Sequence, residues 1–135
     1  MNKNHEIKIR IYYEDTDCGN IVYYANYLRY MERGRTELLR SLGMELSEFH
    51  EKDIIFPVTE ANLKYKQSAR YNDLLTVITT VKEISGASII FQGDIYRGET
   101  LLVSGEVKVA CVRQSTGAPR RVPAEIVSAL KNKFP

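Results

Sequence analysis

Several features that often reveal a protein's class are scarce in this chain. It has two cysteines, Cys18 and Cys111, which are too few for a disulfide framework or a zinc cluster. It has two histidines, His5 in the N-terminal tail and His50 in a polar stretch, so a reaction that pairs histidine with a thiol or an acid is disfavoured. We therefore expect reduced thiols, no metal site and no cofactor.

Long apolar runs and an excess of one charge are also missing. No stretch approaches the roughly 20 apolar residues of a membrane span, and residues 1–5 lack the apolar core of a signal peptide. The 19 basic and 17 acidic residues leave a net charge of +2, which is no broad electrostatic footprint for nucleic acid. We expect a cytoplasmic protein with small-molecule partners, no membrane span and no bound nucleic acid.

The hydrophobic pattern predicts one helix early in the chain. The length of 135 residues fits a single domain over 1–135, which can bury a core without disulfides or metals. Residues 6–12 alternate as a half-buried strand does. Apolar residues then recur at helical spacing from about Tyr24 to Leu42, at Tyr27, Met31, Gly34, Leu38 and Leu42. Charged pairs Arg33–Glu37 and Glu37–Arg40 fit the solvent face of this helix.

The rest of the chain is mainly strand. The polar residues 44–52 indicate at most one helical turn. Residues 54–66 indicate a strand that is bent or on a sheet edge at Pro57. Residues 74–84, 88–97 and 100–112 alternate and are joined by tight turns, as in an antiparallel meander. A loop over 113–121 and a short helix over 123–130 complete the chain. This is an α+β pattern in which the sheet curls around the helix, and its exposed strand edges favour an oligomer.

Two acids, Asp15 and Asp17, lie between the first strand and the helix, just before a Gly19-Asn20 turn. A carboxylate beside the free N–H groups of a helix start suits acid-base or nucleophilic chemistry. Aspartates in turns also commonly cap nearby backbone groups, and the pattern alone favours that structural role.

The stretch over 13–33, YEDTDCGNIVYYANYLRYMER, resembles the signature of the 4-hydroxybenzoyl-CoA thioesterase family of hotdog-fold proteins. More loosely, nearly the whole chain is similar to the acyl-CoA thioesterases associated with the Tol-Pal envelope system. The resemblance implies a curved antiparallel β-sheet wrapped around one long central α-helix. It also implies hydrolysis of acyl-CoA and a homo-oligomer, a dimer of dimers, with sites formed across the dimer.

The resemblance also implies residue roles. Asp17 would attack the thioester carbonyl or activate water, and the backbone N–H of Tyr24 would polarise the carbonyl oxygen. Many relatives have a histidine at the position of Tyr24, so only the backbone role is carried over. Further substrate contacts are expected among residues near the signature and among the basic residues: Asp15, Gly19, Val22, Asn26, Tyr27, Arg70 and Arg120.

Other functions compete with this interpretation. A non-catalytic module that binds acyl-CoA or an acyl carrier protein would use the acids for structure alone. A Mg²⁺-dependent phosphatase is suggested by Asp15-Thr16-Asp17 after an apolar strand, but its usual parallel sheet disagrees with the predicted hairpins. Glu32 is a candidate second acid, although a solvated carboxylate is favoured. The pattern does not specify the acyl group.

Overall fold

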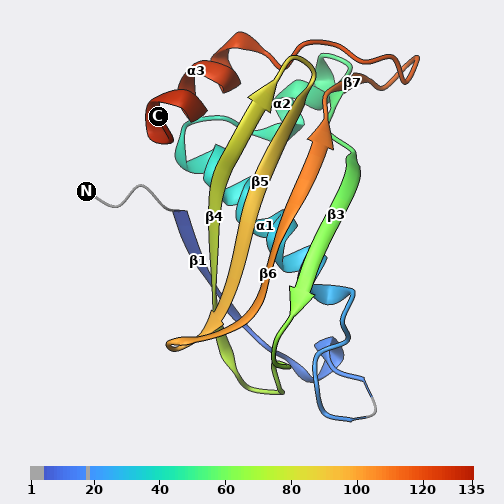
Figure 1. Cartoon of the computed structure of the whole chain (residues 1–135). Coiled ribbons are helices and arrows are strands. Elements are labelled where there is room, and N and C mark those ends of the chain that lie inside the picture. The colour runs from blue at the N-terminus through green and yellow to red at the C-terminus, as the bar shows by residue number, and fades with distance from the viewer. Residues whose placement is uncertain (1–4, 18) are drawn as a thin grey trace.

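Five strands form one antiparallel sheet in the computed structural model, which describes residues 5–17 and 19–135 (Figure 1). The order across the sheet is β1-β4-β5-β6-β3. The strands are β1 (His5–Arg10), β3 (Val58–Tyr65), β4 (Leu74–Ser85), β5 (Ser88–Arg97) and β6 (Thr100–Ala110). Predictions made for Cys18 lie outside the described residues.

The meander at the centre of the sheet follows from tight turns between long alternating strands. Gly86 connects β4 to β5 and Gly98 connects β5 to β6, both with positive φ, a conformation that glycine adopts without strain. Alternate residues of β5 and β6 are buried, so one face of these strands carries the core. The predicted strands over 74–84, 88–97 and 100–112 are confirmed, apart from the last, which ends at Ala110.

The helix α1 (Asn26–Ser41) packs against β1, β4 and β5 (Figure 1). Its predicted apolar stripe is confirmed, because Tyr27, Met31, Gly34 and Leu38 are all buried. The closest approach is at Gly34, where an added Cβ would collide with the Thr79 hydroxyl of β4. The predicted α+β architecture, a sheet packed on one long helix, is confirmed.

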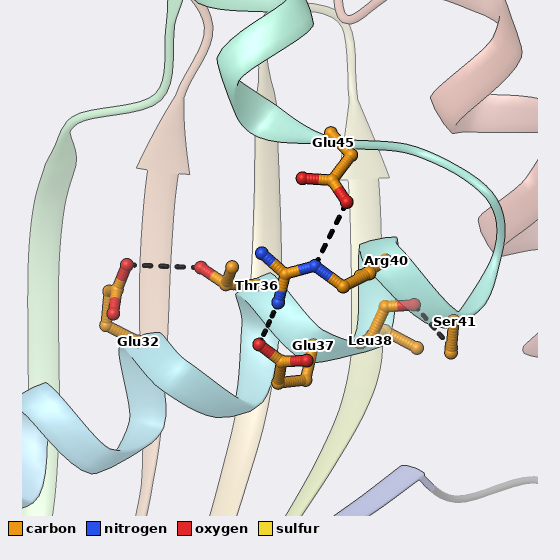
Figure 2. Close-up of polar contacts among 7 residues, drawn as sticks. All are labelled: Glu32, Thr36, Glu37, Leu38, Arg40, Ser41 and Glu45. Atoms are coloured by element: carbon orange, nitrogen blue, oxygen red, sulfur yellow. Dashed lines mark hydrogen bonds and ion pairs between the residues drawn. The ribbon is translucent and has the colours of Figure 1, made fainter.

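Short elements cover one end of the sheet and extend the core. They are α2 (Leu46–Glu51), α3 (Ala124–Lys133), β2 (Ile54–Ile55) and β7 (Val112–Arg113), and β2 pairs with β7. Arg40, in the last turn of α1, pairs with Glu37 and also with Glu45 at the start of α2 (Figure 2). The predicted Glu37–Arg40 pair is therefore confirmed.

Some sequence predictions were wrong in detail. The strand predicted over 54–66 is two strands in different sheets, because Pro57 has no N–H and only its carbonyl joins the ladder, accepting from Ala110 N–H at 2.9 Å. The helix begins at Asn26, because Tyr24 and Ala25 first form a turn closed by the Asn26 N–H, which donates to the Tyr23 carbonyl at 2.9 Å. Arg33 lies over the Tyr30 ring rather than pairing with Glu37.

The structure corrects the predicted position of one histidine and adds detail for the other histidine and for the buried cysteine. His5 is half-buried in β1 opposite Thr79 rather than in a free tail, and His50 is an exposed residue of α2. Cys111 is buried as a free thiol, as predicted, and burial raises the pKa of that thiol. None of the helices in the described residues is long and apolar enough to cross a membrane.

Candidate active site

The loop that carries Asp17 is a small hairpin over residues 16–22. Thr16 pairs with Val22, and the Asp17 N–H donates to the Ile21 carbonyl at 2.9 Å. Asn20 has φ of +61°, a left-handed conformation that asparagine tolerates better than most residues. The predicted turn at Gly19-Asn20 is thus confirmed, with Asn20 as the left-handed residue.

This hairpin is fixed to the segment before β4. Val22 N–H donates to the Ala69 carbonyl at 2.9 Å, and Ile21 forms a bridge with Arg70. Ala69 N–H in turn donates to the Tyr27 hydroxyl of α1 at 2.9 Å. Val22, Tyr27 and Ala69 are all buried, so the hairpin rests on the core.

Asp15 connects the hairpin to the start of α1. Its carboxylate accepts from Tyr12 N–H at 2.8 Å and caps the short 3₁₀ helix η1 (Tyr13–Asp15). Its carbonyl accepts from Tyr23 N–H at 3.1 Å and from the buried Asn26 side-chain amide at 2.9 Å. The side-chain carboxylate and the main-chain carbonyl of Asp15 therefore both fix the conformation of this segment.

The Asp17 carboxylate lies on the surface of the single chain. One of its oxygens, Oδ1, accepts from Gly19 N–H at 3.0 Å, which is the turn-capping contact weighed as its structural role. The residue remains exposed, so the carboxylate is accessible to a ligand. Tyr24 follows the hairpin and is 62% exposed. Its N–H donates to no acceptor among residues 5–17 and 19–135.

A group of tyrosines surrounds the helix start. The Tyr24 ring meets the Tyr65 ring edge-on with centroids 6.2 Å apart, and Tyr65, the last residue of β3, also lies 5.8 Å from Tyr27. Burial raises the pKa of Tyr27 and of Tyr30, and the nearby Asp15 carboxylate adds to the effect at Tyr30. Both buried phenols are protonated at neutral pH, so they act as neutral groups beside the loop.

The predicted basic contacts are far apart in the single chain. Arg70 is exposed beside the hairpin, and its N–H donates to Asp73 at 2.9 Å. Arg120 follows β7, and its N–H donates to the Cys111 carbonyl at 2.9 Å. That region lies at the opposite end of the sheet from the hairpin, which is the blue loop of Figure 1. One chain therefore brings Asp15, Asp17, Gly19, Val22, Asn26, Tyr27 and Arg70 together but not Arg120.

Sequence reasoning missed the contacts that hold the loop. Asn26 was expected to line a pocket, yet its amide binds the Asp15 carbonyl. The sequence did contain a sign of this contact: Asn26 is a polar residue at the buried start of the helix, and a buried amide needs a hydrogen-bond partner. The roles of Ala69 and Tyr65 depend on contacts across more than 35 residues, and no local pattern marks them.

Comparison with known proteins matches this architecture to a family. The family model for the thioesterase-like superfamily matches residues 12–130. The chain belongs to the thioesterase-like superfamily. The acyl-CoA thioesterase YbgC of Haemophilus influenzae is 38% identical over 130 residues, which are 96% of each chain. The acyl-CoA thioester hydrolase YbgC of an Escherichia coli strain is 37% identical and covers 91% of this chain and 92% of its own.

Solved structures give the same result for the thioesterase fold. A probable thioesterase from Bartonella henselae has a TM-score of 0.83 and 34% identity, covering 89% of this chain and 99% of its own. A structure described as BH1999 gentisyl-coenzyme A thioesterase has a TM-score of 0.84 and 27% identity, covering 94% and 99%. The hotdog fold and the thioesterase resemblance predicted from residues 13–33 are confirmed.

Proposed function

We propose that this protein hydrolyses the thioester of acyl-coenzyme A to a free carboxylic acid and CoA, with Asp17 as nucleophile or general base. The proposal for Asp17 is carried by how this residue and the start of α1 are held together. An accessible Asp17 carboxylate lies on a hairpin that Asp15 and Asn26 fix to the start of α1, and the Tyr24 N–H before that helix has no acceptor within residues 5–17 and 19–135. The likeness to YbgC supports the choice of acyl-CoA as substrate.

The chemistry requires a negative charge to form on the carbonyl oxygen. The Tyr24 N–H at the positive end of α1 would donate to that oxygen as the charge develops. In one route an Asp17 oxygen attacks the carbonyl carbon, CoA leaves as thiolate, and water hydrolyses the resulting anhydride. In the other route Asp17 takes a proton from water, the hydroxide attacks, and the CoA thiolate leaves and is then protonated. The Gly19 N–H holds Asp17 in either route.

The proposed site needs a second copy of the chain to exclude water. Asp17 and Tyr24 are both exposed in the single chain, whereas donors stabilise an oxyanion best in a site shielded from water. The neighbouring strand β3 is a sheet edge whose residues are nearly all exposed, and Tyr65 joins that edge to Tyr24. We propose a homodimer in which β3 pairs with β3 of a second copy, and a tetramer built from two such dimers.

This dimer would also bring the distant basic residues to the site. Antiparallel pairing at β3 places the β7 end of one copy beside the hairpin end of the other, because the two strands run in opposite directions. Arg70 of one chain and Arg120 of the second copy would then contact the phosphates of one CoA.

Val22, Asn26 and Tyr27 have buried side chains, so we propose that they position the hairpin. The reduced Cys111 fits a cytoplasmic location.

The decisive experiment measures free thiol released from a panel of aliphatic and aromatic acyl-CoAs. We expect release by the wild-type protein with and without a chelator. Binding of acyl-CoA without thiol release would show a non-catalytic module, the alternative favoured by the Asp17–Gly19 capping contact. The phosphatase alternative is further disfavoured, because its usual sheet is parallel and every strand pair of the described sheet is antiparallel.

A further inference from the structure

Arg97, the last residue of β5, contacts both ends of a loop that precedes β4 and that we call the 68–73 loop. The Arg97 Nη1 atom donates to the Asp73 carboxylate at 2.8 Å and to the Ser68 carbonyl oxygen at 3.3 Å. One guanidinium nitrogen therefore connects the first residue of the loop to its last residue.

The ion pair between Arg97 and Asp73 is more shielded from water than the other ion pairs of residues 5–17 and 19–135. Its side chains are 35% and 21% exposed, whereas each side chain of the other three pairs is at least 41% exposed. A shielded pair is screened less by water and salt than an exposed one. The paired oxygen of Asp73, Oδ2, also accepts from Arg70 N–H at 2.9 Å, so Arg97 holds the side chain that caps the loop backbone.

The 68–73 loop in turn supports the hairpin that carries Asp17. Ala69 is fully buried, and its carbonyl accepts from Val22 N–H at 2.9 Å. Ile21, the neighbour of Val22, forms a bridge with the loop, and its carbonyl accepts from Asp17 N–H at 2.9 Å. A shift of the loop is therefore passed to Asp17 through backbone hydrogen bonds.

We propose that Arg97 is a positioning residue for the reaction, which keeps the Asp17 carboxylate in place through the 68–73 loop and does not touch the substrate. The inference rests on the proposed function, because that proposal assigns the chemistry to Asp17. Displacing a reacting group by about 1 Å can slow a reaction about 100-fold, so a distant support of the loop has a measurable kinetic effect. The competing role is a direct contact between the Arg97 guanidinium and a phosphate of CoA, and kinetics separate the two.

Steady-state kinetics of Arg97→Met test the proposal, since methionine keeps much of the aliphatic bulk and removes both contacts. We expect kcat to fall about tenfold and KM to change less than about twofold, because the reacting group is displaced while the substrate contacts remain. Arg97→Lys keeps a charge that can pair with Asp73 and should retain more turnover than Arg97→Met. A lost phosphate contact would instead raise KM at unchanged kcat.

Two comparisons separate positioning from a general loss of stability. Arg40→Met removes an arginine with two ion pairs at the end of α1 far from the hairpin, so it should lower the urea midpoint slightly and leave kcat unchanged. Asp73→Asn removes the charge that Arg97 pairs with, and it carries the same kinetic expectation if Arg97→Met does not fold. The double variant should lose less turnover than the product of the two single losses, because both substitutions break one contact.

Hydrogen exchange followed by mass spectrometry tests the inference without turnover. Peptides over 19–25 and 66–73 should exchange about fivefold faster in Arg97→Met than in the wild type, because the hairpin and the loop open more often. The same peptides should be unchanged in Arg40→Met. A wild-type protein that releases no thiol from acyl-CoA would overturn the proposed function, whereas the exchange rates report on the support by Arg97 alone.

Three results would overturn the inference. Unchanged kcat in folded Arg97→Met would show that Asp17 does not depend on Arg97. A higher KM at unchanged kcat would assign Arg97 to a phosphate contact. A lower kcat with unchanged exchange over 19–25 would show that the effect does not pass through the hairpin.

Discussion

The side-chain amide of Asn26 donates to the carbonyl oxygen of Asp15 at 2.9 Å, across eleven residues of sequence. Asn26 is the first residue of α1 and is only 8% exposed. The bond therefore sets where the helix start lies relative to the hairpin that carries Asp17. The two groups proposed for the chemistry, the Asp17 carboxylate and the Tyr24 N–H, both belong to the segment that this bond closes.

Replacing Asn26 by alanine should affect turnover more than stability. The Asp15 carbonyl keeps its bond from Tyr23 N–H, so the free energy of unfolding should fall by only about 1 kcal/mol. Small displacements of catalytic groups are costly, and we expect kcat to fall about 10- to 100-fold. Urea unfolding and steady-state kinetics measure the two effects. Asn132→Ala, on the exposed face of α3, is the control and should change neither. Unchanged kcat in a slightly destabilised Asn26→Ala protein would show that the contact positions nothing.

Asp17→Asn should abolish most of the activity without unfolding the protein. Asparagine retains an oxygen that can accept from Gly19 N–H, but it loses the negative charge and basicity. We expect kcat to fall by roughly 10²- to 10⁴-fold with a smaller change in KM and little change in thermal unfolding.

Asp15→Asn provides the comparison within the same loop. Its carboxylate caps η1 through Tyr12 N–H, so the substitution should cost stability and less activity than Asp17→Asn. Near wild-type turnover by Asp17→Asn, or complete loss of activity by folded Asp15→Asn alone, would contradict the assignment of Asp17.

The proposed dimer makes a charge-pairing prediction along β3. The bulge between Val58 and Glu60 leaves a regular edge from Glu60 to Tyr65. We propose the register centred on Asn62, in which Glu60 would lie opposite Lys64 of the second copy. Lys64→Glu should then weaken the dimer by setting like charges opposite each other. The double variant Glu60→Lys with Lys64→Glu should restore it. Light scattering at micromolar concentration measures the mass of each protein.

The single and double variants distinguish two errors in that prediction. A wild-type protein that is monomeric by light scattering would contradict the proposed dimer itself. A dimer that Lys64→Glu weakens and the double variant fails to restore would keep the β3 interface but require another register.

Asp53 should contribute stability that depends on pH. Its carboxylate accepts from the Ser115 hydroxyl at 2.6 Å and from Ser115 N–H at 2.9 Å, and these bonds lower the pKa of Asp53 below its ordinary value. The folded state therefore favours the ionised form. The stabilisation is present above the unfolded-state pKa of about 4 and is lost as pH falls through the lower folded-state pKa.

Asp53→Asn isolates this carboxylate, because asparagine also tolerates the φ of +68° at this position. Urea unfolding should show a stability deficit of the variant at pH 7 that shrinks below about pH 4. An equal deficit at both pH values would mean that the neutral hydrogen bonds, rather than the charge, are responsible.

Local patterns predicted the elements whose structure depends on neighbours in sequence. The alternation over residues 74–84 and the helical spacing of Tyr27, Met31 and Leu38 were sufficient, because each burial pattern repeats within one element. The break after Ile55 was missed because Ile54 and Ile55 pair with Arg113 and Val112, nearly sixty residues away. A proline in a strand-like run indicates a bend or an end, and only the distant partner decides between them.

The site was predicted in part for the same reason. The signature over residues 13–33 located Asp15, Asp17 and the helix start within one segment. It could not show that Asp15 holds backbone through both its carboxylate and its carbonyl, because those bonds depend on the folded positions of Tyr12 and Asn26. Arg120 was grouped with this site by chemistry alone. Its N–H binds the Cys111 carbonyl, and the β7 region that follows Cys111 lies at the other end of the sheet from the hairpin (Figure 1).

The contact between Gly34 and Thr79 limits how an enzyme with this fold can change. A side chain at residue 34 would collide with the buried Thr79 hydroxyl, so this face of α1 keeps its close contact with β4 only while residue 34 is glycine or residue 79 changes with it. Adaptation to a new acyl group cannot proceed by turning the helix, since that would also move the start of the helix, which follows Tyr24. It must proceed by exchanging single side chains around a fixed axis, which leaves the reaction geometry intact while the range of acceptable substrates shifts.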